Sequence, residues 1–235
     1  MKLLSWSHIV GLGCVLASAV PAQAGQVTFG SLLSGQSGIA IPVQSFSERR
    51  FSSTIEQQFD FSCGSAALAT LLTFSYDDPV TEQQVFTGMF RHGNPQLIET
   101  SGFSLLDMKN YLARHGYESA GFRAPLAKLA QVSLPAIVLI NESGYNHFVV
   151  VRGFHDGDII LSDPAVGLKV ESIKRFENQW SGIFFLILTD ASKAQHKFLS
   201  DKMWQNAPEA PIQLARFAIS LATLEQVTIR NAGSF

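Results

Sequence analysis

The hydrophobic pattern of the chain changes once, near residue 117, from a helical period to short β-branched runs. Before that point, apolar residues recur at helical spacing, which predicts helices over 63–75, 81–91 and 104–115. After it, β-branched runs predict strands over 117–123, 136–141, 148–154, 158–162, 168–171 and 182–188. The Asp156-Gly157 step between two of these runs is typical of a hairpin turn. Helices followed by antiparallel strands predict an α+β fold.

Three capping patterns set the starts of the predicted helices. Asp60 or Ser62 is expected to cap the first helix, because both side chains accept hydrogen bonds from free helix amides. Thr81 and Ser104 open the other two helices, and Gly116 is expected to end the third.

The N-terminus has the pattern of a secretory signal peptide. Lys2 precedes the apolar stretch 9–20, which is too short to span a membrane as a helix, and Ala22-Gln23-Ala24 supplies a small-residue cleavage pattern. The alternative is an uncleaved anchor. Cleavage after Ala24 would leave 211 of the 235 residues. No lipid anchor is expected at Cys14, because the three residues before it make a poor lipoprotein signal.

The secreted part is expected to hold one globular domain with two extensions. Residues 25–54 read as an extended arm with a strand at 39–43, residues 55–190 as the domain, and 191–235 as a helical extension. The amphipathic stripe Gln213–Leu224 either packs on the core or docks on a partner or on the membrane surface. The net charge of −2 gives no electrostatic case for nucleic acid or an anionic membrane surface. No other stretch is apolar enough to span a membrane, so no stable membrane insertion is expected after cleavage.

Cys63 would be the only cysteine after cleavage. A lone thiol excludes an intramolecular disulfide and a multi-cysteine zinc site. In an oxidising compartment such a thiol is either buried and inert or retained for its reactivity. Cys63 stands at the start of a predicted helix, where the partial positive charge of free amides stabilises a thiolate.

A thiol nucleophile needs a base and a group that orients the base. His147 precedes a core strand, and Asp163 ends the next strand of the same predicted hairpin, so the hairpin predicts a contact between them. A strand-end histidine bonded to a carbonyl and a simple Asp-Pro turn are the alternatives. His92 and His115 are expected at helix ends, and His155 in a solvated turn.

Two glutamines precede Cys63 and could supply an oxyanion donor. Gln57 and Gln58 lie six and five residues before the cysteine. A side-chain amide aimed at the developing charge contributes about 3 kcal/mol to such a step. Either glutamine could reach back, and both could equally be surface residues.

The residues around Gln57, Cys63, His147 and Asp163 together resemble a known family. The motifs that carry the resemblance are Gln57-x5-Cys63-Gly64-x-Ala66, His147-Phe148-Val149-Val150 and Asp163-Pro164, with supporting runs at 104–106 and 134–138. Over residues 55–190 they resemble the C39 family of papain-like cysteine peptidases. The resemblance implies a papain-like α+β fold with N-terminal helices packed on an antiparallel sheet. It also implies a nucleophile at Cys63, a general base and acid at His147, an orienting Asp163 and an oxyanion donor at Gln57, with no metal and no cofactor.

The best-known C39 members are N-terminal domains of ABC exporters that cut leaders after a double glycine in the cytoplasm. This chain instead carries its own secretion signal, and Asp60–Ala67 resembles stand-alone members associated with functional-amyloid export. The resemblance implies a periplasmic endopeptidase with a protein or peptide substrate, with amyloid-system proteins as partners. A non-catalytic peptide-binding module that assists export, or an acyl or amide transferase, are the alternatives.

Overall fold

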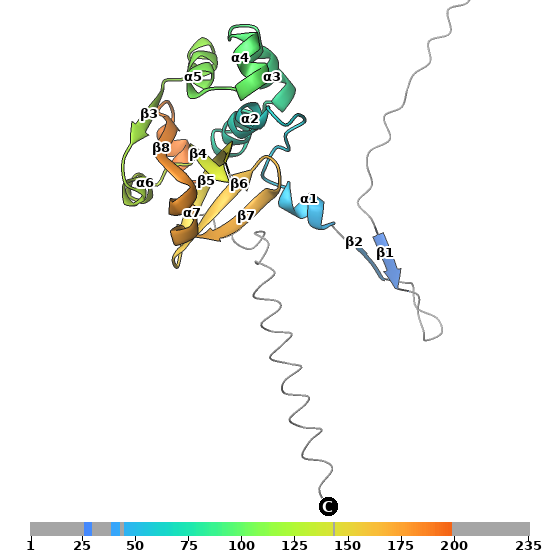
Figure 1. Cartoon of the computed structure of the whole chain (residues 1–235). Helices are drawn as coiled ribbons and strands as arrows, with labels where there is room; N and C mark the ends of the chain where they lie inside the picture. The colour runs from blue at the N-terminus through green and yellow to red at the C-terminus, as the bar shows by residue number, and fades with distance from the viewer. Residues whose placement is uncertain (1–25, 30–38, 43–44, 143, 199–235) are drawn as a thin grey trace, which may run out of the picture. The chain divides into compact units, whose positions relative to one another are not determined.

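The structure is a computed structural model that describes residues 26–29, 39–42, 45–142 and 144–198 (Figure 1). The expected signal peptide 1–24, Cys14 and the stripe Gln213–Leu224 lie outside the described residues. The chain divides into two compact units, Met1–Ser45 and Phe46–Phe235. In the first unit, β1 (Gln26–Phe29) pairs antiparallel with β2 (Ile39–Pro42), so the strand expected at 39–43 is present.

The second unit contains helices and a six-stranded sheet. The helices are α1 (Phe46–Arg50), α2 (Cys63–Ser75), α3 (Glu82–Phe90), α4 (Pro95–Ser101), α5 (Leu105–Arg114), α6 (Leu126–Val132), α7 (Ile173–Gln179) and α8 (Ala191–Gln195). The strands are β3 (Ser119–Arg123), β4 (Ala136–Glu142), β5 (Tyr145–His155), β6 (Asp158–Asp163), β7 (Gly167–Ser172) and β8 (Trp180–Ile187). They form a sheet in the order β3-β8-β4-β5-β6-β7, and every neighbouring pair is antiparallel. This confirms the α+β prediction.

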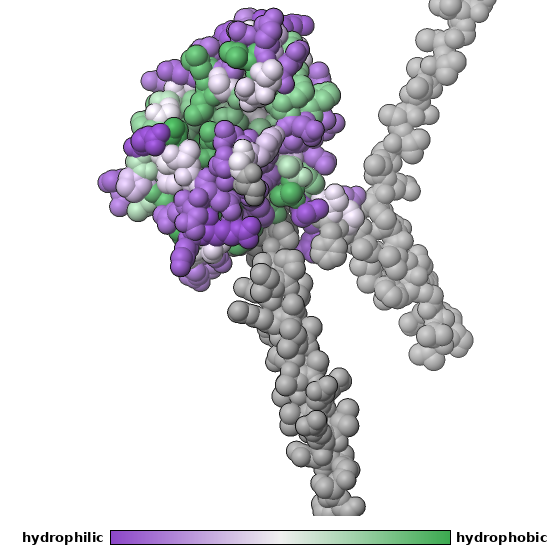
Figure 2. Space-filling view, viewed as in Figure 1, coloured by the Kyte–Doolittle hydropathy of each residue, from purple (hydrophilic) through white to green (hydrophobic). Residues whose placement is uncertain are grey.

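Helix α2 is the centre of the core. It lies between the sheet and the helices α3, α4 and α5 (Figure 1), and its packing partners include β5 and α3. Eleven of its thirteen residues are buried, many of them small, which lets neighbouring elements approach it closely. A helix that is apolar all round has to be enclosed on every side. Figure 2 shows apolar side chains reaching the surface among the helices, whereas the region over α7 and β7 is mostly hydrophilic.

The long elements follow the sequence prediction closely. α2, α3 and α5 occupy the predicted ranges, and capping boxes at Thr81 and Ser104 begin the latter two. Asp156 and Gly157 both have positive φ and form the predicted β5–β6 turn. The short helices α1, α4, α6 and α7 were not predicted, because seven residues or fewer bury too little apolar surface to show a period.

The predicted cap of α2 was wrong in its chemistry. Ser62 occupies the N-cap position, but its side chain makes no capping hydrogen bond. The hydroxyl instead donates to the carbonyl of Phe59 and contacts the carboxylate of Glu82, which is buried. The Oγ atom of Ser62 accepts the backbone N–H of Phe59 at 3.1 Å instead of a helix amide, so the amides at the start of α2 are left without a side-chain cap.

The turn between β6 and β7 depends on Gly167. Its φ is +87°, and a Cβ placed there would lie 2.7 Å from the Cβ and the carbonyl oxygen of Arg50, the last residue of α1. Gly157 has nearly the same φ, +86°, but a Cβ there meets no atom within 4 Å. A side chain at Gly157 would add backbone strain alone, whereas one at Gly167 would add both backbone strain and a steric clash.

We expect Gly167→Ala to lower the free energy of unfolding by roughly 2–4 kcal/mol, and Gly157→Ala by roughly 1 kcal/mol. The second variant carries only the positive-φ cost, whereas the first also pushes the end of α1 away from β7. Urea unfolding followed by circular dichroism measures both. Equal losses in the two variants would contradict the proposed close packing of α1 on this turn.

Among the described residues, no helix combines the length and the apolar character needed to cross a membrane.

Candidate active site

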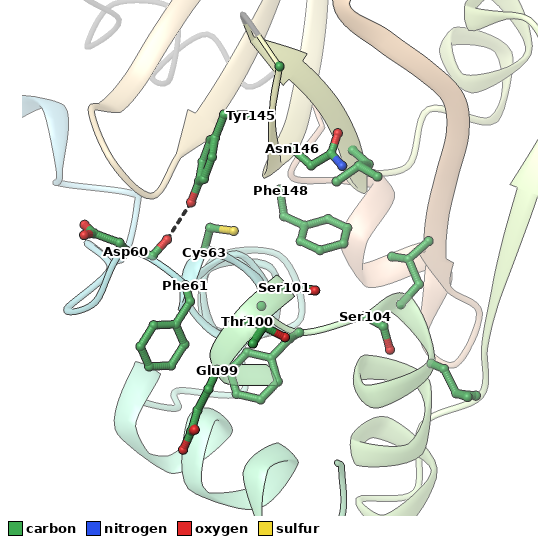
Figure 3. Close-up of a pocket in the computed structure, with 16 residues that line it drawn as sticks. Asp60, Phe61, Cys63, Glu99, Thr100, Ser101, Ser104, Tyr145, Asn146 and Phe148 are labelled. Atoms are coloured by element: carbon green, nitrogen blue, oxygen red, sulfur yellow. Dashed lines mark hydrogen bonds between the residues drawn. The ribbon is translucent and has the colours of Figure 1, made fainter. Parts of the chain in front are cut away.

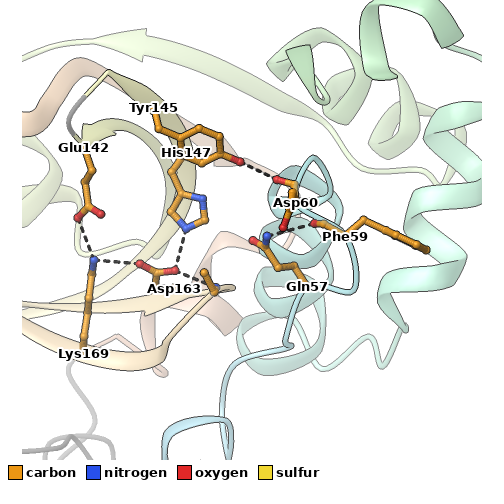
Figure 4. A network of polar contacts seen from close by, with 9 residues as sticks. Gln57, Phe59, Asp60, Glu142, Tyr145, His147, Asp163 and Lys169 are labelled. Carbon is orange, nitrogen blue, oxygen red and sulfur yellow. Dashed lines mark hydrogen bonds and ion pairs between the residues drawn. The ribbon is translucent and has the colours of Figure 1, made fainter. Parts of the chain in front are cut away.

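Three elements bring the predicted residues together at the N-terminal end of α2. Cys63 is the first residue of α2 and is 6% exposed. His147 lies on β5 and Asp163 is the last residue of β6 (Figure 4). His147 is the third residue of β5 and pairs with Ile140 of β4. It therefore lies inside the strand, and the prediction from the sequence that it precedes the strand was wrong.

The predicted contact between His147 and Asp163 is present. The Nε2 atom of His147 lies 2.7 Å from Oδ1 of Asp163, and the two side chains are 6% and 4% exposed. Val150 of β5 pairs with Ser162 of β6, which places Asp163 diagonally across from His147 on the same face of the sheet. Diagonal neighbours in a sheet are within reach of longer side chains, so the register alone accounts for this contact.

The contact with Asp163 engages Nε2 of His147, so Nδ1 is the ring nitrogen left for a nucleophile. Nδ1 is buried and makes no hydrogen bond of regular geometry to any described residue. Burial by itself lowers the pKa of His147, but the hydrogen bond and charge of Asp163, together with the proximity of Cys63, outweigh it and raise the pKa to about 9. Cys63 is therefore close enough to affect the imidazole, and the imidazolium form is the favoured one at neutral pH.

Asp163 is held by contacts to both of its carboxylate oxygens. Oδ1 also accepts the backbone N–H of Ala165 at 2.9 Å, and Oδ2 lies 2.9 Å from Nζ of Lys169. Burial raises the pKa of this carboxyl, but its hydrogen bond to His147 and the charges of His147 and Lys169 bring the pKa well below its usual range. Asp163 is thus ionised wherever the protein is folded near neutral pH.

The structure separates the two candidate glutamines. Gln57 lines a polar pocket of about 460 Å³ together with His147 and Asp163, and its backbone N–H donates to the carbonyl of Pro164 at 3.0 Å. Its side-chain Nε2 donates to the carbonyl of Phe59 at 3.1 Å, and its buried Oε1 has no partner among the described residues. Gln58 is exposed and bonds to Glu56. Only Gln57 lies beside the histidine.

Glu82 is a site-supporting residue that the sequence did not reveal. It lies in the first turn of α3 and is 5% exposed. Its carboxylate accepts the backbone N–H of Gln58 at 3.1 and 3.2 Å and the hydroxyl of Ser62. One carboxylate therefore ties down the residue after Gln57 and the residue before Cys63. In sequence, Glu82 reads only as a polar residue of the Thr81 capping pattern.

A groove of about 820 Å³ opens beside Cys63 (Figure 3). Its lining is mainly apolar and comes from the start of α2, from α4 and α5, from β4 and β5, and from the loops between them. The large apolar residues are Phe61, Phe103, Leu105, Leu106, Leu139 and Phe148. Tyr145 and Asp60 line both this groove and the polar pocket, and the Tyr145 hydroxyl donates to the Asp60 carbonyl at 2.6 Å. Tyr145 and Asp60 therefore lie where the apolar groove and the polar pocket meet.

The other described histidines lie away from this groove and pocket. His92 and His115 contact carbonyls one helical turn earlier in α3 and α5, as expected for helix-end residues. His155 begins the hairpin turn, and its side chain is 62% exposed. No group of three or more histidine, cysteine or acidic side chains among the described residues could hold a metal ion.

A family model described as the peptidase C39 family matches residues 52–193. The chain belongs to the peptidase C39 family. Two members are "probable functional amyloid protease FapD" proteins. The one from Pseudomonas aeruginosa is 44% identical over 146 residues, which span 62% of this chain and 65% of that protein. The one from Pseudomonas fluorescens is 40% identical over 174 residues, 74% of this chain and 76% of its own length.

Solved C39 structures share the fold. The peptidase domain of Streptococcus ComA, an ABC transporter, superimposes with a TM-score of 0.50 at 21% identity, covering 57% of this chain and 96% of that domain. A double glycine motif protease from an AMS/PCAT transporter, solved with its leader peptide, gives 0.50 at 27% identity and covers 57% and 89%. The C39 fold of this chain is the predicted one, with helices on an antiparallel sheet.

Proposed function

We propose that this C39 member is a cysteine endopeptidase that processes a secreted or exported protein of a functional-amyloid system. The observation that carries the proposal is the buried His147–Asp163 pair beside Cys63 at the start of α2, next to an open groove. The two relatives described as functional amyloid proteases support the choice of system. The relative solved with a leader peptide supports a peptide as the substrate.

The geometry suits acyl transfer to a thiol. The Cys63 thiolate attacks the substrate carbonyl carbon, and the resulting oxyanion is stabilised by the free amides at the start of α2 and by the Nε2 amide of Gln57. The Nδ1 proton of His147 then passes to the leaving amine as the C–N bond breaks. Water, deprotonated by His147, attacks the thioester and releases the acid product with the thiol. Asp163 keeps the imidazole oriented and stabilises its charge throughout.

The proposed organisation places this chemistry outside the cytoplasm. Residues 1–24 would direct export and be removed, and residues 55–190 would form the peptidase domain in the periplasm. Residues 25–54 and 191–235 would be extensions of it.

Alkylation of Cys63 tests the proposal without a known substrate. At pH 6.5 we expect iodoacetamide to react with the wild-type thiol about 10–100-fold faster than with His147→Ala, because the imidazolium stabilises the thiolate. His155→Ala, which removes an exposed histidine, is the matched control and should react like the wild type. Mass spectrometry of Cys63-containing peptides gives the rates. Equal, slow rates in wild type and His147→Ala would favour a non-catalytic peptide-binding module.

A further inference from the structure

We propose that Lys169 is a positioning residue that holds Asp163 in the orientation its contact with His147 requires; this inference rests on the proposed function. None of the sequence motifs that resemble the C39 family includes Lys169. The proposal starts from the contact between its Nζ and Oδ2 of Asp163 at 2.9 Å, on the side of the carboxylate that faces away from His147 (Figure 4).

The sheet register fixes this contact. Asp163 pairs with Gly167 across the β6–β7 ladder, and Lys169 is two residues beyond Gly167. Residues two apart in a strand share a face, so Lys169 is the diagonal neighbour of Asp163. His147 holds the same diagonal relation to Asp163 from β5, on the other side of β6. Asp163 thus lies between two cationic side chains from its two neighbouring strands.

Without Lys169, the second oxygen of Asp163 would have no fixed partner. The side chain of Asp163 is 4% exposed, so an unpaired charge on Oδ2 would be poorly solvated. The polar pocket beside it, which Gln57 and Tyr145 also line, offers water to a carboxylate that turns away from His147. Lys169 makes that rotation unfavourable, because its ammonium group pairs with Oδ2 while Oδ1 contacts His147.

Lys169 is itself held in place and kept charged. Its side chain is 23% exposed, and Nζ also lies 3.4 Å from Oε1 of Glu142 at the end of β4. Burial lowers the pKa of Lys169, but the charge and hydrogen bond of Asp163 and the charges of Glu142 and Glu171 outweigh it and raise the pKa. Charge therefore alternates from Glu142 through Lys169 and Asp163 to His147. The other titratable groups that face this row are Cys63, Asp60, Tyr145, Glu171 and Arg175.

The deciding measurement is the titration of His147 in the full chain, followed by NMR of the imidazole nitrogens. In Lys169→Met we expect the pKa of His147 to fall from about 9 by about one unit or more, because Asp163 turns from the ring for part of the time. The iodoacetamide rate at pH 6.5 should fall roughly tenfold with it. Lys169→Arg should restore both values, and Lys128→Met, which removes an exposed lysine of α6, should change neither.

The direction of the shift separates positioning from simple charge. If Lys169 only screened the carboxylate, its removal would raise the pKa of His147, and that result would overturn the proposal. An unchanged pKa and rate would also overturn it. Circular dichroism checks each variant for folding, and Lys169→Gln, which keeps a hydrogen-bond donor, replaces Lys169→Met if the latter is unfolded. Failure of the peptidase proposal itself would appear differently, as an unreactive Cys63 in the wild-type protein.

Discussion

Replacing Cys63 by alanine is expected to abolish processing of the partner protein, with a loss of roughly 10⁴-fold or more. The reason is that alanine has no nucleophilic atom to replace the thiolate at the start of α2. Mass spectrometry of the secreted proteins from cells that carry wild-type or Cys63→Ala protein measures the ratio of intact to processed chains. A new free carboxylate at the cut identifies hydrolysis, whereas an attached acceptor identifies a transferase.

The variant keeps the fold, which makes the result interpretable. Cys63 is buried in the core around α2, and removing one sulfur atom is expected to cost only about 1 kcal/mol. Thermal unfolding of the purified variant provides this control. Because the groove remains, Cys63→Ala should still bind the uncleaved partner and retain it on affinity capture. Processing at the wild-type rate in this variant would refute the peptidase assignment.

Asp163→Asn has the second-largest expected effect. Asparagine keeps the shape of the side chain but removes the charge that raises the pKa of His147, so we expect this pKa to fall from about 9 toward its ordinary value of about 6.5. The step that protonates the leaving amine needs the imidazolium. Activity should therefore be lost as pH rises through about 6.5 in the variant, and through about 9 in the wild type. At neutral pH the processing rate should fall roughly 10²–10⁴-fold, mainly because the imidazole also loses the carboxylate that orients it.

A matched control lies in the same hairpin. Asp156 contacts His155 at 3.3 Å, and these side chains are 89% and 62% exposed. This is therefore a solvent-exposed Asp–His pair that can be compared with the buried Asp163–His147 pair. Asp156→Asn should leave both the rate and the pH profile unchanged, since solvent screens the exposed pair. The measurement is the processing rate between pH 5 and 10. If activity in Asp163→Asn is lost at the same high pH as in the wild type, Asp163 does not control the protonation of His147.

The sequence by itself determined the features that depend on local periodicity and spacing. The helix that begins at Cys63 follows from the run of small apolar residues after it, and the turn at Asp156-Gly157 follows from their tolerance of positive φ. Antiparallel pairing from that turn brings Asp163 near His147, but a register shift between Val151 and Gly153 decides that the two side chains share a face. The proximity was therefore predictable from one hairpin, whereas the bulge that aligns the two side chains was not.

Only the tertiary structure decided which polar residues support the site. Glu82 reaches Gln58 and Ser62 from a separate helix. Lys169 reaches Asp163 because β7 pairs with β6 across the three-residue turn 164–166. In sequence both are ordinary surface-type charges with no motif around them. Burial turns them into fixed partners, since a carboxylate or ammonium out of water has to be paired. Which charges become buried depends on how distant elements pack, and that information is not local to any segment of the chain.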